Sequence, residues 1–167
     1  MALQSAYFTF EPYEIIIISQ ARKIKPNNIL EVIKMIDYTA ILKANPNGVL
    51  ATQDGGKVKT RVFQYLFADR NKVYFCTSGE KPVYDQLQAN PNVSFCTYPQ
   101  NFTPVLSLNG KVVFVEDLAL KTRALDENPP IKGIYNTPEN PVFKIFYIDV
   151  EEVETFSFAE GPNSYTL

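Results

Sequence analysis

The sequence predicts a mainly β fold: a barrel with small helices. From Gly48 onward, short segments that alternate apolar and polar residues follow one another, as strands with one buried face do. Turn residues (Asp, Asn, Gly and Pro) separate these segments. The segments that favour helices are short and begin at proline or aspartate. Because 167 residues can bury a single core, we expect the strands to form one domain.

The first two strands are expected to form a hairpin. Residues 48–52 are an apolar strand, and Asp54-Gly55-Gly56 supplies the positive backbone angles of a tight turn. Residues 57–67 alternate throughout and predict one long strand, which we expect to pair antiparallel with the next. One of its faces has Lys59, Arg61, Phe63 and Tyr65, and the other has Val58, Thr60, Val62 and Gln64.

Two nearly identical segments, VYFCTS at 73–78 and VSFCTY at 93–98, predict two more strands. The residues between them predict a short helix, because Pro82 suits its first position and Asn90-Pro91 ends it. Its apolar stripe consists of Val83 and Leu87. Both cysteines lie in the two similar strands, at a spacing that matches no metal site. We therefore expect each to be a small buried hydrophobe, not half of a disulfide.

The remaining elements complete a set of six strands. Residues 104–116 alternate again, and Asn109-Gly110 marks either a tight turn or the bend of one long strand; we favour the bent strand. Asp117 can cap a helix that runs to about Leu125, a short helical piece follows Pro129-Pro130 near 131–135, and 142–150 form a last strand.

Composition excludes several functions. Sixteen basic and eighteen acidic residues leave no excess charge to attract nucleic acid or an anionic membrane. The absence of histidine removes the usual general base and the commonest zinc or haem ligand, so no metal site is expected. No apolar run is long enough for a membrane helix, and the N-terminus lacks the order of a signal peptide. These features predict a cytoplasmic protein.

One group of residues outlines an anion site. Lys59 and Arg61 lie on one strand, Cys76-Thr77-Ser78 ends another, and Lys81 stands at a helix N-terminus. Cations, hydroxyls and the positive end of a helix dipole all favour a phosphate. The alternative is that the three cations form a solvated face and that Thr77-Ser78 only leads into the helix.

The order of four motifs favours the phosphate site. Four motifs succeed one another between Gly48 and Val93: Gly48-Val-Leu-Ala-Thr, Lys-Thr-Arg-Val-Phe, Val-Tyr-Phe-Cys-Thr-Ser and Lys-Pro-Val-Tyr-x-Gln-Leu-x-x-Asn-Pro-Asn-Val. With these motifs the chain resembles, from about residue 37 to 157, the pyridoxamine 5′-phosphate oxidase-like family of FMN-binding split barrels. The resemblance implies a six-stranded antiparallel split β-barrel with short helices. It also implies a homodimer with two FMN molecules at the subunit interface.

The resemblance assigns roles by position in the motifs. Arg61 matches the strand arginine that contacts the flavin phosphate, and Lys81 resembles the second phosphate-binding cation. The residues that match the strand backbone beside the isoalloxazine are Val62, Phe63 and Gln64. Those that match the following strand end are Cys76, Thr77 and Ser78. The resemblance points to no catalytic acid or base, because the redox chemistry belongs to the flavin.

Differences from the true oxidase argue against the oxidation of pyridoxamine phosphate. The true oxidase ends in a basic segment with tryptophan and arginine, whereas this chain ends in FAEGPNSYTL and has no tryptophan. We therefore expect an FMN-dependent oxidoreductase that acts on another small molecule. A non-catalytic flavin-binding or electron-carrier module and a deazaflavin-dependent reductase are the alternatives. A barrel that binds single-stranded nucleic acid would use exposed aromatic residues, but the chain lacks the basic groove for it.

Residues 1–34 show no clean periodicity and are treated separately from residues 35–167, the expected single domain. A first helix is expected to begin at Met35, with Ile36, Ala40 and Ile41 on its apolar face. The codons of Glu31-Val32 could form a ribosome-binding sequence before Met35. We therefore expect Met35 to be the natural start and residues 1–34 to be a mis-assigned extension. A genuine extension that covers the dimer or the flavin is the alternative.

Overall fold

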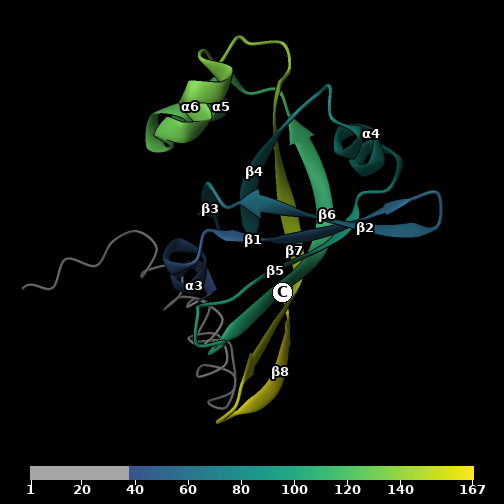
Figure 1. The fold of residues 1–167 in the computed structure, drawn as a ribbon, viewed down its shortest axis with the longest axis vertical. Helices are drawn as coiled ribbons and strands as arrows, with labels where there is room; N and C mark the ends of the chain where they lie inside the picture. The colour runs from purple at the N-terminus through teal and green to yellow at the C-terminus, as the bar shows by residue number, and fades with distance from the viewer. Residues whose placement is uncertain (1–37) are drawn as a thin grey trace, which may run out of the picture. The chain divides into compact units, whose positions relative to one another are not determined.

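The computed structural model describes residues 38–167, which form one sheet and four helices (Figure 1). The strands are β1 (Asn47–Asp54), β2 (Lys57–Gln64), β3 (Phe67–Asp69), β4 (Lys72–Ser78), β5 (Asn92–Thr97), β6 (Val105–Val115), β7 (Phe143–Ser157) and β8 (Gly161–Thr166). The helices are α3 (Tyr38–Ala44), α4 (Pro82–Ala89), α5 (Leu118–Glu127) and α6 (Pro129–Tyr135). The expected extension 1–34 lies outside the described residues.

All the described strands pair antiparallel in the order β2-β1-β5-β6-β7-β4-β3, and β8 adds to β7. The two end strands of this path, β2 and β3, are consecutive in the chain, so the sheet curls back on itself. The predicted mainly β, split-barrel fold is confirmed. None of the helices within the described residues is long and apolar enough to cross a membrane.

The prediction of one long strand over residues 57–67 is wrong. β2 ends at Gln64, and the chain then exchanges one pairing partner for another. The amide of Tyr65 donates to the carbonyl of Pro46, whereas the amide of Leu66 donates to the carbonyl of Tyr74 on β4. Only β3, the last part of the segment, forms the expected antiparallel pair with β4; β2 pairs with β1. The burial pattern does not alternate through the corner: Tyr65 is in the barrel core, and Leu66 and Phe67 are both in a second apolar core.

Glycines explain the hairpin and the bend that the sequence predicts. Gly55 and Gly56 have φ angles of 54° and 82°, which allows a two-residue turn between β1 and β2. The register of β6 against β7 shifts at Asn109/Gly110, so the long strand bends at a bulge. A Cβ atom on Gly110 would collide with the backbone oxygen of Asp149. Both predictions are confirmed.

The sheet has eight described strands where six were expected. The corner at Tyr65 accounts for one extra strand, and β8 is the other. Its sequence, GPNSYT, contains residues that are rare in strands, and therefore gave no signal. β7 extends beyond the expected 142–150 because its outer half pairs with β8.

Two apolar cores lie on opposite faces of β4 and β7. Val73 and Phe75 of β4 face the barrel core, together with Phe146 of β7. Tyr74 and Ile145 face a second core that α5 and α6 cover (Figure 1). Burial on both faces explains why VYFCTS is apolar almost throughout.

Helix α3 confirms the expected first helix only in part. It starts at Tyr38 as described, and residues 35–37, with Ile36, lie outside the described residues. The predicted apolar face is wrong in one position, because Ala40 is exposed whereas Tyr38 and Leu42 are buried. Ile41 packs against the barrel core as expected. The tyrosine ring buries more area than alanine, and its hydroxyl donates to the carbonyl of Arg70 at 2.9 Å.

The other helices match their sequence signals. α4 begins at Pro82 and buries Val83 and Leu87, as predicted. α6 begins at Pro129. Asp117 caps α5: its carboxylate accepts from the amides of Ala119 at 2.8 Å and Leu120 at 3.1 Å.

Replacing Asp117 with alanine should lower the free energy of unfolding by about 1 kcal/mol, because two amides of α5 lose their acceptor. Urea unfolding followed by circular dichroism measures this change. Asp126→Ala is the matched control, since Asp126 forms only an exposed ion pair with Lys132 and its loss should cost about 0.5 kcal/mol or less. Equal effects of the two substitutions would contradict the assigned cap.

Candidate functional site

Arg61 lies on the inner side of β2 and reaches across to β1 and α4. Its guanidinium donates from Nη1 to Thr52 Oγ1 and from Nη2 to Gln86 Oε1, each at 2.7 Å. Both acceptors are neutral. Within the described residues no carboxylate pairs with Arg61, so its charge is available to an anion.

The end of β4 supplies a buried hydroxyl without a partner. Thr77 is 2% exposed, and its Oγ1 is the one buried side-chain polar atom among residues 38–167 that makes no hydrogen bond. Buried polar groups are almost always paired, so an unpaired hydroxyl marks a place for a missing group. The neighbouring hydroxyl, Ser78 Oγ, accepts from the amide of Glu80 at 3.2 Å.

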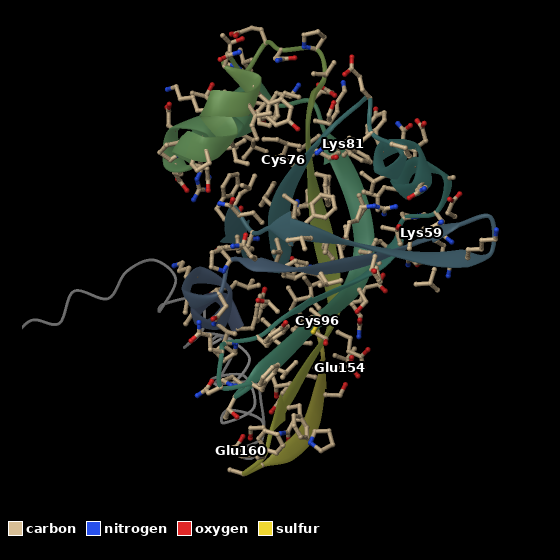
Figure 2. The ribbon with its side chains drawn as sticks, in the orientation of Figure 1. Lys59, Cys76, Lys81, Cys96, Glu154 and Glu160 are labelled. Atoms are coloured by element: carbon tan, nitrogen blue, oxygen red, sulfur yellow. The ribbon has the colours of Figure 1, made fainter. Side chains whose placement is uncertain are left out.

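Lys81 precedes the first turn of α4 and is exposed. Its side chain makes no cap, and in the part of the chain that the structure describes its ammonium group makes no ion pair. Figure 2 shows Lys81 beside Cys76 at the end of β4, with Lys59 apart from them on the β1–β2 hairpin. Only Gly79, Glu80 and Lys81 separate the end of β4 from the first residue of α4.

Cys76 is a poor nucleophile in this setting. Burial raises the pKa of its thiol to about 12, against a smaller lowering effect of the Lys81 charge. At neutral pH the thiol is protonated, and thiolate chemistry is not available. Both Cys76 and Cys96 are free thiols, each only partly exposed.

The remaining predicted residues of β2 point in different directions. The ring of Phe63 is in the barrel core, edge-on to Phe146 at 5.7 Å. Val62 is 73% exposed on the opposite face, and Lys59 is exposed near the hairpin. Gln64 donates from Nε2 to Asn128 Oδ1 at 3.2 Å. In β2 the side chains of Arg61 and Phe63 share one face, and those of Val62 and Gln64 share the other.

Three of the nine predicted residues, Thr77, Ser78 and Lys81, thus lie where the chain passes from β4 to α4, and Arg61 is bonded to α4 through Gln86. Cys76 packs against the second core. Sequence reasoning missed the residues that hold the predicted side chains. Thr52 and Gln86 orient Arg61, and Asn128 orients Gln64. These partners are distant in the chain, and no local motif signals such contacts.

The described residues contain no group of three or more histidine, cysteine, aspartate or glutamate side chains that could hold a metal ion. The site is therefore best described as a cationic corner with free hydroxyls. Such a donor set binds phosphate groups.

Comparison with known proteins identifies a family for this chain. A family model described as pyridoxamine 5′-phosphate oxidase matches residues 37–157. A search of curated proteins found no match.

Several solved structures share the fold. A NimC/NimA family protein from Clostridium acetobutylicum has a TM-score of 0.71 and 24% identity, over 80% of this chain and 94% of the other. General stress protein 26 from Bacillus anthracis has a TM-score of 0.68 and 21% identity, over 77% and 95%. A heme-binding protein from Mycobacterium smegmatis has a TM-score of 0.63 and 18% identity, over 75% and 55%. At these identities the likeness establishes the fold alone.

Proposed function

The chain belongs to the pyridoxamine 5′-phosphate oxidase family through residues 37–157, and from this premise we propose that it is a cytoplasmic flavoprotein. In this proposal it binds FMN at the interface of a homodimer and transfers electrons to or from a small molecule. The observation that supports it best is the buried, unpaired hydroxyl of Thr77. In this proposal that hydroxyl and two cations, Arg61 and Lys81, bind the same phosphate; neither cation has a carboxylate partner among the described residues.

The residues present fit the phosphate of FMN. Arg61 would hold it through charge-assisted hydrogen bonds, and Lys81 would add a second positive charge. The Thr77 hydroxyl would gain the acceptor that it lacks. The Ser78 hydroxyl would contribute a further donor.

The redox chemistry would come from the flavin itself. This chain would supply binding and orientation: the backbone of Val62 and Phe63 and the amide of Gln64 would border the ring system. The contact of Gln64 with Asn128 fixes where that amide points.

A visible absorption spectrum of the purified protein, with mass identification of the released cofactor, tests this proposal. We expect a yellow protein that releases FMN, and bleaching with a reduced nicotinamide followed by recovery with an acceptor. Colour without turnover would identify a flavin-binding module, and a deazaflavin mass would identify the other reductase class. A colourless protein that fails to bind added FMN at micromolar concentration would refute flavin binding.

The outer face of the sheet supports a dimer. Register places Val62 of β2, Val49 of β1 and Cys96 of β5 side by side, and this row points away from the barrel core. Val62 is 73% exposed and Val58 is 71% exposed. At the other end of this face, Phe156 of β7 is 39% exposed. Large exposed apolar side chains on one continuous face are typical of an interface, and a twofold dimer needs a face that can pack on itself.

Replacing Val62 with aspartate should convert the dimer to a monomer, because two carboxylates would be buried without partners. Light scattering after size exclusion measures the mass of each species. Ile134→Asp is the matched control: Ile134 is 65% exposed on α6, away from the outer face, and its replacement should leave the mass unchanged. A Val62→Asp protein with the mass of wild type would place the interface elsewhere.

A further inference from the structure

A cavity of about 300 Å³ lies between the start of α5 and the segment that leads into β7. Its polar lining residues are Glu116, Lys121, Glu139, Asn140 and Lys144. The volume is at the lower end of the range for small-molecule sites. Lys144 of this lining is the cross-strand partner of Thr77, so the cavity adjoins the end of β4 that is part of the candidate site.

Lys121 is the unusual member of this lining. Its side chain is only 9% exposed, and lysine is among the residues least often buried. Its ammonium group donates to Glu116 Oε2 at 2.7 Å, which is its one ion pair within the described residues. An ammonium group has three donors, so two of them have no acceptor among these residues. Burying a charge with so few partners is costly unless a ligand completes its contacts.

Lys144 approaches the same carboxylate from β7. Its ammonium group donates to Glu116 Oε1 at 2.8 Å, so one carboxylate bridges two lysines. Hydrogen bonds from Lys121 and then Lys144 lower the pKa of Glu116, so its carboxylate is charged at neutral pH. Glu116 itself is 61% exposed, which leaves room above it for another group.

We propose that this cavity binds the carboxylate of a small organic acid through the free donors of Lys121 and Lys144. Glu116 already shows that a carboxylate fits between the two ammonium groups. The two lysines balance the two glutamates of the lining, so a monoanion is repelled less than a phosphate dianion. The side chain of Lys121 is 9% exposed and that of Lys144 is 21% exposed, so water screens these charges less than it would at the open surface.

The position of the cavity links it to the proposed cofactor site. A Cβ atom on Gly79 would lie 3.4 Å from Cε of Lys144, so this lysine packs against the turn between Ser78 and Lys81. An acid in the cavity would lie beside that turn. If FMN binds as proposed, small organic acids are therefore the substrate class to test first. This last step rests on the proposed function, whereas binding of the acid does not.

Titration of the flavin-free protein with benzoate, followed by NMR or calorimetry, tests the binding itself. We expect saturable binding with a Kd of about 1 mM or tighter. Benzamide, which has the same shape without the charge, should not bind, and inorganic phosphate should not displace benzoate. Absence of saturation, equal binding of benzamide or ready displacement by phosphate would each overturn the proposal. Because no flavin is present, this result is independent of FMN binding.

Substitutions of the lining residues test whether benzoate binds in this cavity. Lys121→Met keeps the length of the side chain and should weaken benzoate binding about tenfold or more, equivalent to about 1.4 kcal/mol. Glu116→Gln should strengthen it, because both lysines lose their competing carboxylate. Lys132→Met is the control, since Lys132 is an exposed lysine of α6 paired with Asp126, and should bind as wild type.

Unfolding curves check that each variant is folded. Lys144→Met is a second variant at a more exposed position, since the side chain of Lys144 is 21% exposed. It tests benzoate binding if Lys121→Met fails to fold. Its expected result is the same loss of affinity. If the folded lysine variants destabilise the protein but bind benzoate normally, then the lysines only tie α5 to the sheet and the proposal is wrong.

Discussion

Replacing Arg61 with alanine should weaken FMN binding by about 1.5–3 kcal/mol, or roughly 10-fold to 150-fold in Kd. The substitution removes a charge-assisted contact to the phosphate. Arg61 is held toward α4 by Thr52 and Gln86, so little ordering is needed when the phosphate binds. Fluorescence quenching of added FMN measures the affinity.

Riboflavin sharpens this experiment because it lacks the phosphate. If Arg61 acts on the phosphate, then Arg61→Ala should leave riboflavin affinity unchanged while FMN affinity falls. Arg61→Lys should recover part of the loss, since it keeps the charge but cannot form two parallel contacts. Arg123→Ala is the matched control: Arg123 pairs with Glu127 on α5 and should not affect FMN. Unchanged FMN affinity in Arg61→Ala would show that the phosphate binds elsewhere.

Replacing Phe75 with alanine should lower the free energy of unfolding by about 3–5 kcal/mol. Phe75 is fully buried, and its ring lies 4.8 Å from that of Phe95 and 5.6 Å from that of Phe146. The substitution leaves a cavity at the centre of the barrel core, directly before the residues that end β4. Urea unfolding measures the change.

Phe158→Ala is the matched control for the core substitution. Its ring is 79% exposed, so its removal should change stability by about 0.5 kcal/mol or less. If Phe75→Ala loses as little stability as Phe158→Ala, then the barrel core collapses around the cavity and tolerates it.

Local signals in the sequence predicted the elements that depend on local chemistry. Pro82 and Asn90 mark both ends of α4, and Gly55-Gly56 marks the hairpin, because these residues act on their own backbone. The corner at Tyr65 was not predicted, because the change of partner there depends on strands far away in the chain. β8 was missed because it is stabilised by its pairing with β7 and not by the propensity of its residues.

The candidate site likewise contains some residues that local signals predicted and others that they did not. Thr77, Ser78 and Lys81 are neighbours in the chain, so a motif could indicate them. The contact between Arg61 and Gln86 joins a strand to a helix across the fold, and no spacing in the sequence predicts it. The unpaired state of the Thr77 hydroxyl is visible only when every surrounding group has been placed.

The late position of β7 in the chain affects how the protein folds during its synthesis. β7 joins β4 over Phe143–Asp149 and β6 over Ile145–Phe156, so the central part of the sheet closes only after β7 leaves the ribosome. Until then β4 and β6 lack the strand that lies between them. Contacts between residues so far apart in the chain form slowly. The nascent chain therefore exposes unpaired strand edges longest at β4, where aggregation during expression should begin.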